Sequence, residues 1–221
     1  MTGGSLMVTN GSTTIGKFGV GQLTISNTTM QACDVTIAAQ LGSSGTFTLN
    51  MGTLTTSGLL NNTNGFIKGV GTIDGSVVNA GTISPGFSPG RIFITSNLTL
   101  QATSVLVMEL GGTATNDYDQ IFVGNNLQAD GTLSVSLINA FDPALSNSFH
   151  IFDFATSGGE FSLTKLPALD AGLAWDTSAL MTDGDISVIG VPEPSTCVLV
   201  FGACAGLSLL RPRSRIRRPS S

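Results

Sequence analysis

Side chains capable of acid–base chemistry are sparse in this chain. The only histidine, His150, stands in an apolar run between Phe149 and Ile151, a setting more typical of a strand residue than of a general base. The acidic residues are scattered, and several adjoin Gly or Asn as turn residues do, so they do not resemble the paired carboxylates that cleave glycosidic bonds. The sequence contains no Gly-x-Ser-x-Gly, P-loop or dinucleotide-binding motif. We therefore expect no enzymatic activity and no catalytic residues.

Two Asp-x-Asp pairs, Asp117/Asp119 and Asp183/Asp185, could supply carboxylate oxygens to Ca²⁺. Neither pair continues into an EF-hand loop or a glycine-rich nonapeptide repeat, so we interpret both as turn and cap residues. Cys33 stands alone in the body of the chain, and no Cys/His spacing suggests zinc. We expect no metal site and no cofactor.

Any site would have to be positioned by strands. Only 10% of the residues are charged, and β-branched and aromatic residues recur between Gly and Asn. Runs such as Gly21–Ser26, Gly45–Asn50 and Gly52–Ser57 alternate apolar and polar residues, which predicts strands with one buried face. The Thr-x-Thr pairs Thr46/Thr48 and Thr53/Thr55 are also found on flat ice-binding faces, but Thr is common on any exposed strand.

A Gly-Thr-apolar unit recurs at irregular spacing, beginning at residues 45, 52, 71, 81 and 131. This pattern fits stacked strands joined by turns of varying length. We predict an all-β fold, a right-handed β-solenoid with a β-rich C-terminal cap, followed by a short C-terminal transmembrane helix. A β-sandwich with hairpin connections is the alternative.

Charge is distributed unevenly along the chain. Residues 1–190 hold thirteen acidic residues against four basic ones, whereas residues 191–221 hold one acidic residue and five arginines. Nucleic acid is bound through Lys and Arg, so an acidic body argues against a nucleic-acid partner.

Four segments of the second half of the body carry a resemblance. They are Gly81–Gly90 (GTISPGFSPG), Leu106–Gly111 (LVMELG), Tyr118–Ile121 (YDQI) and Leu173–Thr177 (LAWDT). In their order and spacing they resemble the C-terminal region of proteins with autotransporter-associated β-strand repeats. That resemblance implies a secreted, β-helical surface protein without known catalysis.

The C-terminal segment has three parts, each with a physical role. Prolines 192 and 194 hold the peptide extended, the form that a protease cleft accepts. The apolar run 197–210 would span about 21 Å as a helix, which is short against a hydrocarbon core of about 30 Å. Arginines should stay on the cytoplasmic side and leave the body on the far side. The five arginines are Arg211, Arg213, Arg215, Arg217 and Arg218.

This three-part tail resembles the PEP-CTERM sorting signal. The resemblance implies recognition of the motif Val191, Pro192, Glu193, Pro194 and Ser195 by an exosortase, a membrane processing enzyme of exopolysaccharide-making bacteria. The alternative is a plain C-terminal anchor with a proline-rich stalk. Residues 1–5 show neither a charged n-region nor an apolar h-region, so we expect a signal peptide and earlier strands upstream of Met1.

We therefore expect three regions: a solenoid over residues 1–115, a β-rich C-terminal part of the same body over 116–189, and a sorting signal over 190–218. The signal comprises the motif 191–195, the membrane helix 197–210 and the basic tail 211–218. The expected function is that of an exported structural or adhesive protein of the envelope or matrix, held briefly in the inner membrane, with exosortase and possible exopolysaccharide partners. The alternative is a secreted carbohydrate-binding or carbohydrate-cleaving β-helix protein with the same tag.

Overall fold

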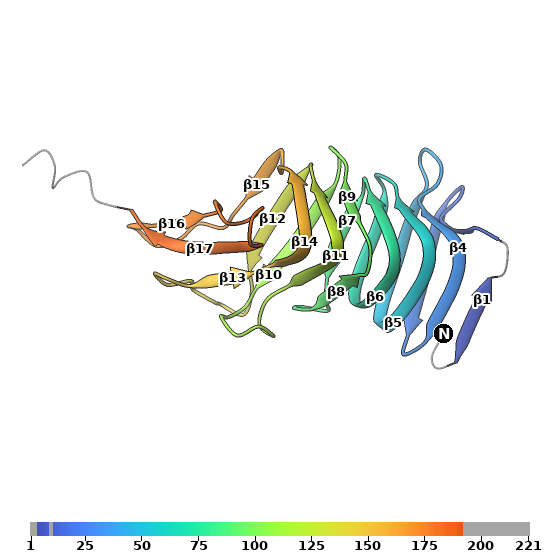
Figure 1. Ribbon diagram of the computed structural model, residues 1–221, viewed down its shortest axis with the longest axis horizontal. Coiled ribbons are helices and arrows are strands. Elements are labelled where there is room, and N and C mark those ends of the chain that lie inside the picture. The colour runs from blue at the N-terminus through green and yellow to red at the C-terminus, as the bar shows by residue number, and fades with distance from the viewer. Residues whose placement is uncertain (1–3, 9–10, 192–221) are drawn as a thin grey trace, which may run out of the picture.

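The computed structural model describes residues 4–8 and 11–191, and over these residues the fold is all-β, without a helix (Figure 1). The expected all-β class is confirmed. The expected membrane helix at 197–210 lies outside the described residues. The strands are β1 (Ser5–Val8), β2 (Thr13–Ile15), β3 (Val20–Ser26), β4 (Thr29–Ile37), β5 (Ser44–Asn61), β6 (Gly65–Asn79), β7 (Thr82–Pro85), β8 (Arg91–Ile94), β9 (Leu98–Leu100), β10 (Val105–Leu110), β11 (Gln120–Ala129), β12 (Thr132–Leu137), β13 (Ser148–His150), β14 (Phe152–Gly159), β15 (Leu163–Lys165), β16 (Leu173–Asp176) and β17 (Asp185–Gly190).

Fourteen of these strands form one sheet, and every strand pair within it is parallel. Hairpins produce antiparallel neighbours, so the large sheet is not built from hairpins. Its strands follow one another along the long axis of the molecule, from β1 at one end to β14 and β15 near the other (Figure 1). The parallel sheet also runs past residue 115 without interruption, because β10 pairs with β12 and β8 pairs with β11.

Period-two alternation explains the core. In β5, Phe47 and Leu49 are buried, Met51 is exposed, and the alternation resumes one residue later with the buried Gly52 and Leu54. In β10 the buried residues are Leu106, Met108 and Leu110. The register places buried residues of successive strands against one another in columns. One column is Met30, Leu54, Ile73, Ile94 and Val123; a second is Val35, Leu59, Val77, Leu98 and Leu127; a third is Phe47, Ile67, Ile83, Leu106 and Leu133.

These columns supply the main stabilisation of the sheet. Each of their side chains is at most 3% exposed, and burying one such side chain contributes about 1.5–3 kcal/mol. Parallel register alone would not hold the strands, since the polar backbone bonds exchange with water at little net gain. The apolar columns therefore fix which strand lies beside which.

Two glycines allow the long strands to bend. Gly69 has a φ of 102° and Gly75 a φ of 155°, and a β-carbon at these positions would overlap the carbonyl oxygens of Leu49 and Thr56 respectively. Only glycine accepts both the positive φ and the close approach. The corner next to Asn61 and Asn79 is held differently, by a fully buried amide pair in which Asn61 Nδ2 donates to Asn79 Oδ1 at 2.7 Å.

The C-terminal end carries a small antiparallel sheet in the order β13-β17-β16 (Figure 1). Phe149, in the edge strand β13, is fully buried, with Tyr118 and Phe141 edge-on to its ring and Trp175 tilted against it. Ring centroids lie 5.6–5.9 Å apart, a range in which aromatic pairs attract each other. This aromatic cluster joins the two sheets.

Some strand boundaries differ from the sequence prediction. The runs 45–50 and 52–57 belong to one long strand, β5, and the register shifts between Asn50 and Gly52 without ending the ladder. The apolar run around His150, residues 148–154, is split between the two sheets, because Ile151 and Phe152 both donate their backbone N–H to the carbonyl of Gly184. His150 therefore belongs to the antiparallel sheet and Phe152 to the parallel one.

Candidate functional site

Of the expected sorting motif, only Val191 lies within the described residues. Its side chain is exposed, and its backbone N–H donates to the carbonyl of Gly172 at 2.8 Å. Pro192, Glu193, Pro194, Ser195 and the five arginines 211–218 lie outside the described residues. No helix among residues 4–8 and 11–191 has the length and apolar character needed to cross a membrane.

Three of the four segments that carry the body resemblance meet at one point. Asp119 accepts a hydrogen bond from the Gly90 N–H on Oδ1 at 2.7 Å and one from the Glu109 N–H on Oδ2 at 2.9 Å. Glu109 in turn accepts a hydrogen bond from the Ser88 hydroxyl at 2.6 Å. The loop 85–90, the end of β10 and the start of β11 are therefore tied together through one carboxyl group. The sequence interpretation of Asp119 as a solvated turn residue is wrong, because its side chain is fully buried.

The environment of Asp119 perturbs its ionisation. Burial raises the pKa of Asp119 to about 7, against the lowering effect of the two backbone hydrogen bonds and with a smaller contribution from the charge of Glu109. Perturbed carboxyl groups are found at catalytic sites but also in structural networks. Both oxygens of Asp119 are taken up by backbone N–H groups, so we interpret this carboxyl group as a structural clamp.

His150 has a carboxylate partner, Asp185, in the neighbouring strand of the antiparallel sheet. His150 Nδ1 lies 2.7 Å from Asp185 Oδ1, and the two side chains are 45% and 36% exposed. The pair lies on the open surface, where an ion pair contributes little. Asp183 bonds instead to the Thr182 hydroxyl, and the part of the chain that the structure describes holds no group of three or more His, Cys, Asp or Glu residues placed to bind a metal.

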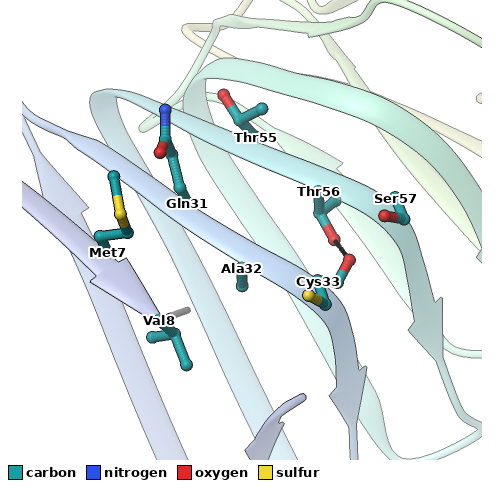
Figure 2. Close-up of a pocket in the computed structure, with 8 residues that line it drawn as sticks. All are labelled: Met7, Val8, Gln31, Ala32, Cys33, Thr55, Thr56 and Ser57. Atoms are coloured by element: carbon teal, nitrogen blue, oxygen red, sulfur yellow. Dashed lines mark hydrogen bonds between the residues drawn. The ribbon is translucent and has the colours of Figure 1, made fainter. Parts of the chain in front are cut away.

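A hollow of about 490 Å³ lies beside Cys33, where β4 and β5 bend (Figure 2). Its lining combines Met7 and Val8 of β1 with Gln31, Ala32 and Cys33 of β4 and with residues 55–57 of β5. The Thr56 hydroxyl donates to the Cys33 carbonyl at 2.8 Å, the bond drawn in Figure 2. Cys33 is exposed, although an unpaired cysteine in a strand is more often a small buried apolar residue. Its neighbours in this hollow are amide, hydroxyl and apolar side chains, none of which could act as a base toward the thiol.

A second hollow lies further along the same sheet, and we call it the Phe recess. It has a volume of about 340 Å³ and is lined by Phe93, Ile94, Thr95, Phe122, Val123, Gly124, Asp153, Phe154 and Ala155. Phe93 and Phe122 stack with ring centroids 4.6 Å apart and an interplanar angle of 15°. Phe93 is 41% exposed, although a large apolar side chain is normally covered.

The register explains how the Phe recess forms. Phe93 pairs with Phe122, and Phe122 pairs with Asp153, so these three outward-facing side chains form one column across β8, β11 and β14. Beside them stand Gly124 and Ala155, whose small size leaves the hollow open. A β-carbon at Gly124 would overlap the carbonyl oxygen of Thr95, so a larger residue cannot fill the recess without moving the backbone.

Sequence reasoning missed this site. Phe93 and Phe122 occupy outward positions of the runs 91–94 and 118–123. A large apolar residue at a position where a polar one is expected was the signal in the sequence that could have indicated a binding surface. The register between the two runs, which brings the rings together, could not be read from the sequence because the connection between them is long.

The charge of the Phe recess is acidic. Asp153 is the ionisable group among the described residues that line it, and Thr95 donates its hydroxyl to Asp74 at 2.8 Å just beside it. Arg91 stands two residues before Phe93 in β8, and its guanidinium bonds to Thr115 and Asn116. Lys68 and Lys165 belong to β6 and β15, the strands that pair with β7 and β12.

The Thr-x-Thr pairs do not build a continuous threonine face. In the register, Thr46 is followed by Phe66 and Thr48 by Lys68, so an aromatic residue and a charged residue interrupt the two columns. The columns of Thr53 and Thr55 continue into Thr72 and Asp74. A flat array that matches an ice surface is not formed by these positions.

Comparison with known proteins adds no assignment to this geometry. No protein-family model matches the chain, and no curated protein matches it by sequence.

Proposed function

We propose that this chain is an exported structural or adhesive protein of the bacterial envelope or extracellular matrix, without enzymatic activity, and that its body is a right-handed β-solenoid. The observation that carries the proposal is the register of the large sheet. Each core column passes through hydrogen-bonded parallel strands in chain order, as in Leu54 of β5, Ile73 of β6 and Ile94 of β8. Three such columns run through the chain in the same order, which is what repeated turns of one helical path produce.

The handedness follows from general rules for parallel strands. Crossovers between parallel strands of one sheet are right-handed in nearly all proteins. A solenoid of this kind is a rigid rod whose stability comes from contacts between neighbouring turns. Such a rod suits a structural role, because it holds its surface side chains at fixed positions along the long axis seen in Figure 1.

The C-terminal segment 191–218 carries the proposed localisation. Residues 191–195 would be recognised by an exosortase, with 197–210 held in the inner membrane and the arginines of 211–218 in the cytoplasm. The body would then lie in the periplasm or at the cell surface before release or transfer. The motif, the short apolar run and the arginine cluster in the sequence support this part of the proposal.

Carbohydrate binding is the second candidate, and the Phe recess favours it over carbohydrate cleavage. Hydrolysis of a glycosidic bond needs two carboxyl groups about 5–9.5 Å apart across the bond. The described lining of the recess contains one carboxyl group, Asp153, beside the exposed ring of Phe93 and the half-buried ring of Phe122. That arrangement can hold a ligand, and a second carboxyl group for cleavage is not among the residues that line it.

Mass spectrometry of the chain recovered from a host that carries an exosortase tests the sorting proposal. We expect a mature chain that ends near residues 191–195 and lacks Arg211–Arg218. Changing Pro192 and Pro194 to Ala should leave the full-length chain in the membrane fraction, whereas Pro143→Ala, in a loop of the body, should be processed normally. A mature wild-type chain that retains the arginines would exclude processing and leave a membrane anchor.

A further inference from the structure

We propose that the Phe recess binds an amine-bearing pyranose unit of a polysaccharide. This inference rests on the proposed adhesive function and names the surface that performs it. The stacking of the exposed Phe93 on the half-buried Phe122, the Asp153 carboxylate beside them and the pairing of β11 support it.

The aromatic pair provides the platform. Phe93 covers one face of the Phe122 ring, and the next residue in the column on the other side of Phe122 is Asp153 rather than a third aromatic residue. A ligand ring can therefore pack against Phe122 where the aromatic column ends. The hollow made by Gly124 and Ala155 gives that ring room, and its volume of about 340 Å³ falls at the lower end of small-ligand sites.

Charge selects the chemistry of the ligand. The carboxylate of Asp153 offers acceptors to hydroxyl and ammonium donors, and Asp74 adds a second negative charge behind Thr95. A cation beside an aromatic ring and a carboxylate is stabilised by both. An acidic sugar or a phosphate would instead be repelled by Asp153, because the guanidinium of Arg91, two residues from Phe93 in β8, is held by the Thr115 carbonyl and the Asn116 side chain.

The pairing of β11 argues for a saccharide over a basic peptide. An extended peptide binds a sheet chiefly by adding a strand to an open edge. β11 is paired on one side with β8 and β9 and on the other with β14, so a peptide could add a strand only at the far edge of β14, away from the Phe93–Phe122 pair. A pyranose carries its own hydroxyl donors and a flat C–H face, and needs only the side chains that the recess presents.

Calorimetric titration of the full chain in mild detergent with a glucosamine hexamer tests the proposal. We expect saturable binding that weakens as salt is added. Phe122→Ala and Asp153→Asn should each weaken binding about tenfold. The matched controls are Phe87→Ala and Asp142→Asn, an exposed phenylalanine and an exposed aspartate outside the recess, and both should bind like the wild type. Circular dichroism checks that each variant is folded.

Titration with two other ligands tests whether the Phe recess is specific for an amine-bearing sugar. A galacturonic acid hexamer should not bind, and a lysine-rich peptide of equal charge should bind more weakly than the glucosamine hexamer. Unchanged binding in folded Phe122→Ala and Asp153→Asn, no binding of the glucosamine hexamer, or stronger binding of the peptide or the acidic sugar would each overturn the inference. Sorting of the chain is measured separately by its processed C-terminus, so failure at the recess would leave the proposed export and processing standing.

Discussion

Asp119 gives the sharpest quantitative expectation, because its carboxyl group is buried and both of its oxygens accept backbone hydrogen bonds, from Gly90 at 2.7 Å and from Glu109 at 2.9 Å. Removing it with Asp119→Ala leaves two buried N–H donors without partners, which costs about 1–3 kcal/mol each. We therefore expect a loss of about 2–6 kcal/mol in the free energy of unfolding near neutral pH.

The pH dependence follows from the raised pKa of Asp119. Its pKa is about 7 in the folded protein against an ordinary value of 3.8, so the folded state binds the proton more tightly than the unfolded state does. The resulting contribution to stability is complete below pH 3.8 and is lost as the pH rises through 7. Between pH 4.5 and 7.5 the loss amounts to about 3 kcal/mol.

Urea unfolding followed by circular dichroism measures this effect in the wild type and in Asp119→Asn. Asp119→Asn cannot titrate at this position, so its stability should lack the decline between pH 4.5 and 7.5 that the wild type shows. Asp130 and Asp176, whose pKa values are lowered by hydrogen bonds to Ser162 and Ser178 respectively, titrate in both proteins and cancel in the comparison. Asp117→Asn, at an exposed neighbour, should follow the wild type. Parallel profiles for the wild type and Asp119→Asn would refute the reasoning.

Two further substitutions separate core from surface. Leu54→Ala removes a fully buried member of a core column and should lower the free energy of unfolding by about 2–5 kcal/mol. Thr53→Ala, at the neighbouring outward-facing residue, should change the free energy of unfolding by less than about 0.5 kcal/mol. Equal effects of the two substitutions in urea unfolding would contradict the assignment of Leu54 to the core and Thr53 to the surface. Asp185→Asn removes the half-exposed partner of His150 and should cost less than about 1 kcal/mol, and a larger loss in thermal unfolding at pH 7 would show that the pair is structural.

Much of the local structure could be predicted because strand pattern is a local property. Alternation within 104–110 and 131–138 predicts strands that the structure places at β10 and β12, and the alternation also tells which side chains are buried. Positions where the local pattern and a hydrogen bond from a distant segment favour different pairings were harder to predict. The segment 148–154 alternates on either side of two adjacent buried residues, Ile151 and Phe152, and it divides there because both donate their backbone N–H to the carbonyl of Gly184.

The candidate sites show the same division. The motif 191–195 and the arginines of the tail are recognisable in the sequence, since their chemistry depends on residues close together in the chain. Asp119 and the Phe recess are assembled from segments far apart, and only pairing across strands brings Gly90 to Asp119 or Phe93 to Phe122. No local pattern distinguishes Asp119 from a solvated turn residue.

The sequence alone therefore determined an all-β body, the inward and outward faces of its strands, the acidic charge of that body and the chemistry of its tail. Tertiary structure decided which strand pairs with which, and with it the clamp at Asp119, the exposed His150–Asp185 pair and the hollow beside Phe122. The physical reason is that side-chain alternation repeats every two residues, so it sets the face of a residue but leaves its neighbour in the next strand open. Burial of whole columns of apolar side chains then selects one register among many.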